Sequence, residues 1–160
     1  MPQGAQHRIL MICMGNICRS PLAENVLRHK VRERGVEHLF TIDSAGTGGW
    51  HVGEPPDARV SRVAASHGVK MTGVARQVMH DDFQKFDLLI CMDQDNRDHI
   101  LKMGAPPDRV HLLLEFDPAA SHREVPDPYY GGADGFELVY RLVDSASDGL
   151  LDHLLDGRAS

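Results

Sequence analysis

Four short apolar segments, separated by helical patterns and polar loops, organise this chain. Residues 8–13 and 87–92 are nearly continuous apolar runs, which is typical of strands buried on both faces. Residues 40–44 alternate as a strand does, and residues 110–114 form the fourth run. Strands that alternate with helices predict an α/β fold with a four-stranded parallel sheet covered on both faces, a three-layer sandwich.

Helical periodicity accounts for most of the chain between these strands. Apolar residues recur at helical spacing from Leu22 onward, and Gly35 is well placed to end that helix. Asp57 is suited to cap a second helix, which we expect to stop near Gly68. The remaining expected segments are a connector over 69–80, a short helix near 80–85, a polar helix from Asp93 through Leu101, an irregular segment over 116–133 and a helix over 135–155.

Size and composition fit one soluble globular domain over residues 1–160. The chain has 160 residues, of which 42% are hydrophobic and 25% charged. No apolar run approaches the roughly 18 residues that a membrane span requires, so we expect none. The first residues carry neither the basic region nor the apolar stretch of a secretory signal, and the cytoplasm is the expected location.

Cysteine, histidine and charge counts narrow the expected partners. Three cysteines argue against a disulfide framework. Ten histidines are scattered without the spacing of a metal site, so we expect neither a metal nor another cofactor. The net charge of -6 works against nucleic-acid binding, for which a basic surface is expected.

The most informative stretch is residues 13–21, CMGNICRSP, between the first strand and the first helix. Five residues separate Cys13 from Arg19, a length that lets the loop surround a tetrahedral oxyanion while the sulfur faces its centre. Arg19 can hold two of the oxygens with its planar set of donors, and Ser20 adds a hydroxyl. These groups favour a thiolate over a thiol, so the groups that bind phosphate also activate the nucleophile. The loop lacks the lysine of a nucleotide-binding Walker A motif.

Residues 13–21 resemble the signature of the low-molecular-weight protein tyrosine phosphatases. A distant second match is residues 127–131, DPYYG, which resemble that family's general-acid loop. Shorter stretches agree as well, at residues 43–47, 75–77 and 86–93, and the resemblance covers about residues 7–155. It implies a flavodoxin-like fold with strand order 2-1-3-4. It further implies hydrolysis of protein phosphotyrosine and small aryl phosphates through a phosphocysteine intermediate.

The proposed site residues follow the rule that ligands bind beyond the carboxyl ends of parallel strands. Cys13 is the expected nucleophile, Arg19 the oxyanion clamp and Asp127 the general acid and base. The expected substrate-binding residues are Met14, Gly15, Asn16, Ile17, Cys18, Ser20, Trp50, Tyr129 and Tyr130, the three aromatic residues forming walls for a phenyl ring. The expected supporting residues are Ser44, His67 and Asp93.

The family resemblance also bears on the supporting roles. It suggests that Ser44 and His67 contact the Asn16 side chain, although a histidine before Gly68 is also suited to end a helix. Asn16 is expected to brace the loop in a left-handed conformation. The resemblance further suggests a reversible disulfide between Cys13 and Cys18 under oxidation.

Three other functions share features of this pattern. Thiol-dependent arsenate reductases share the fold and loop but need a relay of further cysteines, for which the chain offers only Cys91. Phosphoarginine phosphatases tend to have threonine after the nucleophile, where this chain has the bulkier, apolar Met14. A catalytically silent phosphate-binding module would not need Asp127. The expected partners are phosphotyrosine proteins and an oxyanion in the loop, and the chain is expected to be a monomer or a weak dimer.

Overall fold

The computed structural model describes residues 7–128 and 133–159. A four-stranded parallel sheet with the order β2-β1-β3-β4 forms its centre, which confirms the predicted fold class and strand order. The strands are β1 (His7–Cys13), β2 (Phe40–Gly46), β3 (Leu88–Cys91) and β4 (Val110–Leu112).

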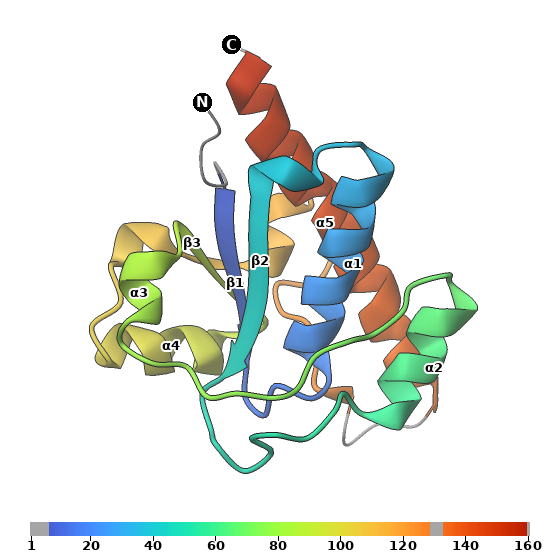
Figure 1. Ribbon diagram of the computed structural model, residues 1–160, viewed down its shortest axis with the longest axis horizontal. Coiled ribbons are helices and arrows are strands. Elements are labelled where there is room, and N and C mark those ends of the chain that lie inside the picture. The colour runs from blue at the N-terminus through green and yellow to red at the C-terminus, as the bar shows by residue number, and fades with distance from the viewer. Residues whose placement is uncertain (1–6, 129–132, 160) are drawn as a thin grey trace.

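Helices cover both faces of this sheet (Figure 1). The helices α1 (Arg19–Glu33), α2 (Ala58–Ser66) and α5 (Ala133–Ala159) lie on one side, and α3 (Asp82–Lys85) and α4 (Gln94–Lys102) lie on the other. The described residues also include the short 3-10 helices η1 (Glu37–Leu39), η2 (Pro107–Arg109) and η3 (Leu113–Phe116).

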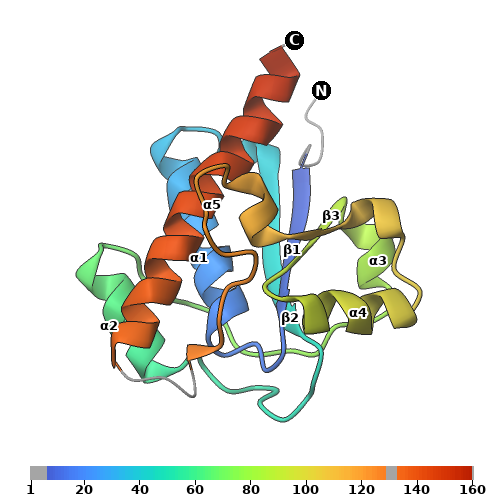
Figure 2. The same cartoon turned by 180° about the vertical axis from the view of Figure 1, so that it is seen from behind.

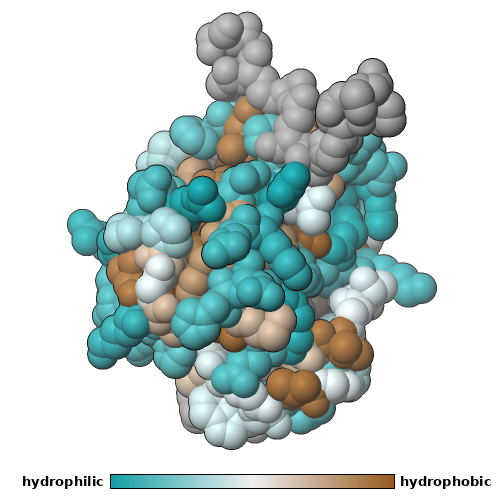
Figure 3. Space-filling view, turned by 60° about the vertical axis from the view of Figure 1, so that its left-hand side comes forward, coloured by the Kyte–Doolittle hydropathy of each residue, from teal (hydrophilic) through white to brown (hydrophobic). Residues whose placement is uncertain are grey.

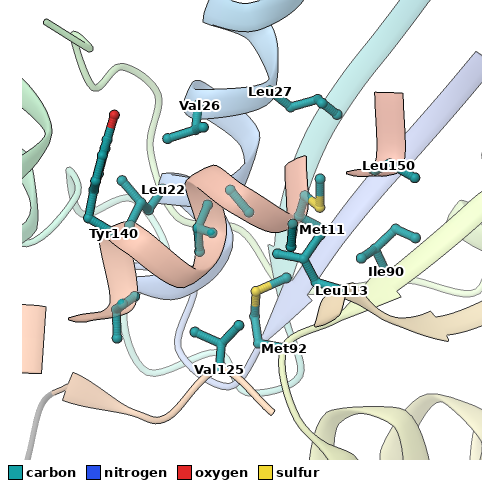
Figure 4. Close-up of a cluster of buried hydrophobic side chains, with 14 of the residues drawn as sticks. Met11, Leu22, Val26, Leu27, Ile90, Met92, Leu113, Val125, Tyr140 and Leu150 are labelled. Carbon is teal, nitrogen blue, oxygen red and sulfur yellow. The ribbon is translucent and has the colours of Figure 1, made fainter. Parts of the chain in front are cut away.

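The apolar run in β1 is explained by the two layers it faces. Ile9 and Met11 pack into the core beneath α1 and α5, whereas Leu10 and Ile12 pack into the core beneath α3 and α4. All four side chains are fully buried. Figure 4 shows the larger core, in which labelled residues of the sheet and the following turns meet those of α1 and α5: Met11, Leu22, Val26, Leu27, Ile90, Met92, Leu113, Val125, Tyr140 and Leu150.

Several element boundaries differ from the predicted ones. The helix α1 begins at Arg19, before the apolar pattern that starts at Leu22, so the end of the phosphate-loop motif is already helical. The strand β4 ends at Leu112, because the chain turns into η3 and packs under α5. A Cβ at Gly149 of α5 would lie 1.9 Å from the Phe116 oxygen, which shows how closely this turn approaches the helix.

Among the residues that the structure describes, no helix combines the length and apolarity needed to cross a membrane.

Candidate active site

The loop that follows β1 lies at the carboxyl end of the sheet, at the lower end of Figure 1. The chain after β2 holds it from one side, since Thr47 N–H donates to the Cys13 carbonyl and Gly48 N–H to the Met14 carbonyl, both at 2.9 Å. A Cβ at Gly46 would lie 2.8 Å from the Met14 oxygen. Glycine at position 46 therefore permits the close approach that keeps the loop in place.

The Cys13 sulfur faces hydrogen-bond donors from within the loop. Its side chain is buried, the Asn16 N–H donates to the sulfur at 3.3 Å, and the Ser20 hydroxyl lies 2.9 Å from it. Because Ser20 Oγ already accepts a hydrogen bond from Asn16 Nδ2 at 2.8 Å, its own hydrogen can point to the sulfur. Both contacts stabilise negative charge on sulfur.

Asn16 braces the loop from behind. Its φ of 58° lies in the left-handed region, which asparagine tolerates better than most residues. Nδ2 donates to Ser20 and, at 3.0 Å, to Ser44, while Oδ1 accepts the Arg76 N–H at 2.9 Å. The side chain thus joins the loop, β2 and the segment before α3.

The brace continues into a buried carboxylate. Ser44 donates to Glu24 Oε1 at 2.5 Å, and Arg28 donates to Glu24 Oε2 at 2.7 Å. Glu24 is 8% exposed, and its pairing with Arg28 offsets the cost of burying its charge. The hydrogen-bond chain therefore runs from the sulfur to the middle of α1.

Arg19 is buried at the start of α1 and is held by two neighbouring segments. Its Nη1 donates to Asp93 at 2.5 Å and to the Val125 carbonyl at 3.1 Å. Burial alone would lower the pKa of Arg19, but the Cys13 sulfur and the Asp93 carboxylate outweigh it, and the pKa lies above the ordinary arginine value. The guanidinium is therefore a fixed cation next to Cys13.

Asp93 holds Arg19 because of its place in the fold. It follows β3 and caps α4, accepting the Asn96 N–H at 2.9 Å, while Asn96 accepts the Asp93 N–H at 3.1 Å. This capping box fixes one carboxylate oxygen and leaves the other for Arg19. Asp93 thus links the start of α4 to Arg19.

Asp127 approaches Arg19 from the segment after η3. This segment is attached to the end of β3, since Val125 N–H donates to the Met92 carbonyl at 2.8 Å. The Asp127 carboxylate lies 3.8 Å from Arg19 Nη2, and its side chain is 27% exposed. A carboxyl group so placed can reach an ester oxygen of a molecule bound over Cys13.

Cys13, Arg19 and Asp127 line one cavity of about 330 Å³. The other lining residues are Met14, Gly15, Ile17, Cys18, Trp50 and His51. Met14 and Trp50 are 40% and 71% exposed, so the mouth of the cavity is partly apolar. In Figure 3, apolar side chains lie close together at the lower right, toward the end of the molecule where Figure 1 places the loop.

The other two cysteines have different surroundings from Cys13. Burial, together with the carboxylate of Asp57, raises the pKa of Cys18 to about 12. Burial also raises the pKa of Cys91, which lies in the core on the α3 and α4 side of the sheet. Cys18 lines the cavity together with Cys13, and none of Cys13, Cys18 and Cys91 is in a disulfide.

The expectation for His67 is wrong. His67 does not contact Asn16; its Nε2 lies 2.9 Å from a Glu137 oxygen, and its ring stacks on Tyr140 at 4.0 Å. It ends α2, which was the alternative interpretation of a histidine before a glycine. Both partners of His67 belong to α5, about 70 residues further along the chain, so the residues around His67 in the sequence did not predict these contacts.

The other predicted residues divide into lining and bracing groups. Asn16 and Ser20 do not line the cavity with the residues named above; their side chains turn to the brace behind the loop. Ser44 contacts Asn16, as expected. Tyr129 and Tyr130 lie outside the described residues.

Sequence reasoning missed three residues of the site and its brace: Glu24, His51 and Arg76. His51 lines the cavity, and a Cβ on Gly15 would lie 3.0 Å from its ring. The Arg76 side chain binds both oxygens of the buried Asp82 at 3.0 Å, which fixes the N–H that reaches Asn16. Residues 75–77 agree with the family resemblance, which pointed to Arg76, but nothing in the residue pattern indicated its role in the brace.

Within residues 7–128 and the described part of α5, no group of three or more histidine, cysteine or carboxylate side chains is arranged to hold a metal ion.

Comparison with known proteins identifies the family. The profile of the family described as "Low molecular weight phosphotyrosine protein phosphatase" matches residues 8–159. A Streptomyces coelicolor protein described as a low molecular weight protein-tyrosine-phosphatase is 44% identical, over 96% of this chain and 99% of its own. The human low molecular weight phosphotyrosine protein phosphatase is 39% identical, over 88% of this chain and 91% of its own.

Solved structures agree with these relatives. A protein tyrosine phosphatase from Entamoeba histolytica superposes with a TM-score of 0.91 at 34% identity, over 95% of this chain and 99% of that chain. A drosophila arginine phosphatase superposes with a TM-score of 0.85 at 31% identity, over 91% of this chain and 96% of that chain. With its cysteine, arginine and aspartate gathered at the carboxyl end of the sheet, the chain belongs to the low molecular weight phosphotyrosine protein phosphatase family.

Proposed function

We propose that the chain hydrolyses phosphotyrosine in proteins, and small aryl phosphates, through a phosphocysteine intermediate. The observation that carries the proposal is that a sulfur, a guanidinium and a carboxyl group line one cavity. Cys13 is the nucleophile, Arg19 binds the phosphoryl oxygens and Asp127 transfers protons. No cofactor enters the reaction.

In the first step, the Cys13 thiolate attacks phosphorus and the bond from phosphorus to the phenolic oxygen breaks. The Ser20 and Asn16 hydrogen bonds stabilise the thiolate before attack. Protonated Asp127 gives its proton to the departing oxygen, because a phenolate leaves poorly without one. Arg19 stabilises the charge on the transferring group.

In the second step, water attacks the phosphocysteine. Asp127 accepts a proton from that water, the bond from phosphorus to sulfur breaks and inorganic phosphate leaves. The thiolate is restored, and the Ser20 hydroxyl again donates to it. The same carboxyl group therefore acts as acid and then as base.

The mouth of the cavity favours an aromatic phosphate ester. Met14 and Trp50 give apolar surface there, and aromatic contacts contribute about 0.5 to 1.5 kcal/mol each. Because Cys13 is buried below the cavity mouth, the site should select phosphotyrosine over the shorter phosphoserine. From the family resemblance, we propose that Tyr129 and Tyr130 also contact the phenyl ring of the substrate.

Phosphoarginine is the second candidate substrate, because a drosophila arginine phosphatase shares the fold at 31% identity. The apolar Met14 at the cavity mouth favours the aromatic substrate over the cationic guanidinium of phosphoarginine. Arsenate reduction is a poorer fit. A thiol relay would need Cys91, which is fully buried and lies in the core on the opposite side of the sheet from the one that contains Cys13.

A kinetic panel tests the proposal. Wild type, Cys13→Ser and Asp127→Asn would be assayed with phosphotyrosine peptides, phosphoarginine, arsenate and a series of aryl phosphates. We expect Cys13→Ser to abolish hydrolysis of every ester. Asp127→Asn should lose about 10² to 10⁴ in rate, and the loss should grow as the leaving group becomes more basic.

The matched control for this panel is Asp81→Asn, which removes an exposed carboxylate outside the cavity and should leave the rates unchanged. An equal loss for Asp127→Asn across the leaving-group series would remove its assigned role. Faster turnover of phosphoarginine than of phosphotyrosine would overturn the substrate assignment.

We further propose that the chain works in the cytoplasm on phosphotyrosine-containing proteins, as a monomer or a weak dimer, and does not bind nucleic acid. The net charge of -6 supports the last point. Sedimentation across a concentration series would test the oligomeric state.

A further inference from the structure

A second, larger crevice lies beside the segment that carries Asp127. Its volume is about 740 Å³, and none of its lining residues lines the active-site cavity. In Figure 2, the orange segment after η3 runs down beside α5 toward the loops at the lower end of the sheet. The crevice is bounded by this segment, by β4 and η3, and by the first turn of α4.

The lining of the crevice is amphipathic. Leu112, Leu114 and Pro126 supply apolar surface, while Arg97 and Arg123 supply guanidinium groups. The crevice can therefore hold a ligand that has both a hydrocarbon portion and a charged head group.

The acidic groups of the crevice are already paired. Glu124 accepts the Gln94 N–H at 2.6 Å, and Glu115 lies 3.3 Å from the His111 ring nitrogen. Each carboxylate therefore has one hydrogen-bond partner within the protein and keeps its negative charge.

The cationic groups of the crevice are not paired. Neither Arg97 nor Arg123 makes a side-chain hydrogen bond or an ion pair with the residues that the structure describes. The Nε of Arg97 is buried and without a hydrogen-bond partner among them. Buried donors are nearly always satisfied in native proteins, so the side chain of Arg97 has hydrogen-bonding capacity that its neighbours do not use.

We propose that this crevice binds a small amphipathic anion, with a carboxylate or phosphate head on Arg97 and Arg123 and an apolar body against Leu112, Leu114 and Pro126. The two guanidinium groups form no ion pair with the acids of the crevice, so both can give charge-assisted hydrogen bonds to a bound anion, and the apolar wall selects a ligand with a hydrocarbon portion. The site is separate from the one that holds the substrate phosphate.

The position of the crevice couples it to the proposed catalytic groups. Pro126 is adjacent to Asp127 in the chain, and Arg97 follows Asp93 by one helical turn, with its N–H donating to the Asp93 carbonyl at 3.2 Å. Asp93 in turn holds Arg19. An occupant therefore touches both the segment that carries the proton donor and the helix that fixes the partner of the guanidinium. This coupling rests on the proposed function, whereas the binding itself does not.

A titration with octanoate and with octylphosphonate tests the binding. Orthovanadate would first fill the active-site loop, and amide NMR signals would report where each probe binds. We expect saturable shifts in residues 112–126 and in the first turn of α4, with octanol and acetate causing neither. Both probes are expected to bind; shifts from one probe alone would identify its head group as the one recognised.

Variants of the two arginines supply the controls. Arg97→Gln and Arg123→Gln should each weaken binding roughly tenfold, the effect of losing one charge-assisted hydrogen bond. Arg62→Gln, which removes an exposed cation outside the crevice, should leave the affinity unchanged. Arg123 is exposed, so its replacement keeps the test valid even where the Arg97 variant folds poorly.

A second readout separates this proposal from the proposed function. Octanoate should change the kcat for p-nitrophenyl phosphate without raising its KM, and Arg123→Gln should remove that effect. Shifts confined to residues 13–19, binding unaffected by both arginine replacements, or no binding would overturn the site. An unchanged kcat at saturating octanoate would overturn the coupling. Binding in a protein that hydrolyses no ester would remove the proposed function while leaving the site in place.

Discussion

Replacing Asn16 with alanine removes the centre of the brace behind the loop. The change deletes the hydrogen bonds to Ser20 and Ser44 and leaves the Arg76 N–H without its acceptor. It also places alanine at a φ of 58°, a left-handed conformation that strains alanine more than it strains asparagine.

The expected loss of stability follows from these contacts. Three hydrogen bonds at about 1 kcal/mol each give roughly 3 kcal/mol. Left-handed strain adds about 1 kcal/mol, for a total near 4 kcal/mol. Asn16→Gly loses the same bonds without the strain, so it should be about 1 kcal/mol more stable than Asn16→Ala.

Urea unfolding measures both differences. With a slope of about 2 kcal/mol/M, Asn16→Ala should unfold at a midpoint roughly 2 M below that of wild type. Its kcat/KM for p-nitrophenyl phosphate should fall roughly tenfold or more, because the Ser20 hydroxyl loses the partner that directs it to sulfur.

Asn25→Ala is the matched control. Asn25 is also a buried asparagine, and it bonds to Pro21 and Thr72 without touching the sulfur. This variant should lose stability but keep its kcat. Equal stability of the alanine and glycine variants at position 16, or full activity of Asn16→Ala, would refute the reasoning.

Three further predictions concern the cavity mouth, the cysteines and a helix cap. A Cβ on Gly48 would lie 1.8 Å from the Trp50 ring, so Gly48→Ala should displace the indole and lower kcat/KM for aryl phosphates about two- to tenfold, with urea stability changed by less than about 0.5 kcal/mol. Iodoacetate at pH 7 should label Cys13 and spare Cys18, whose pKa of about 12 keeps it a thiol; peptide mass mapping with Cys13→Ser as control checks this, and substantial labelling of Cys18 would contradict it. The hydrogen bond from Arg59 lowers the pKa of Asp57, so the ionised Asp57 carboxylate stabilises the folded protein above about pH 4, and this stabilisation is lost as the pH falls through the folded-state pKa. In melting curves, the Tm of Asp57→Asn should therefore change less with pH below about 5 than the Tm of wild type.

The sequence predicted those parts of the fold that depend on local pattern. Residues 8–13 had to be a central strand, because the run is apolar on both of the faces that β1 presents to helices. Asp57 was predicted as a helix cap, and its side chain accepts the Arg59 N–H at 2.8 Å. The loop from Cys13 to Arg19 was identifiable because its chemistry is concentrated in a few consecutive residues.

Features that depend on distant segments were beyond that reasoning. Residues 69–80 show no periodicity because they are held by main-chain bonds to other segments, such as the bond from Gly46 N–H at the end of β2 to Arg76 O at 2.9 Å. His67 was assigned to the wrong partner because the ring that stacks on it, Tyr140, comes from α5. The strand β4 gives way to η3 at Leu113, and η3 packs closely against a residue far along the chain, Gly149 of α5.

Val125 ties the segment that carries Asp127 to the rest of the site through main-chain atoms alone: its N–H donates to the Met92 carbonyl, and its carbonyl accepts a hydrogen bond from Arg19. Most side-chain replacements at position 125 therefore leave both main-chain hydrogen bonds intact, whereas proline would delete the N–H and with it the hydrogen bond to Met92. The position of the Asp127 segment relative to Arg19 therefore depends little on which side chain occupies position 125. In a library of substitutions at this position, we expect loss of activity mainly with proline and with side chains too large or too polar for the buried space that the valine fills.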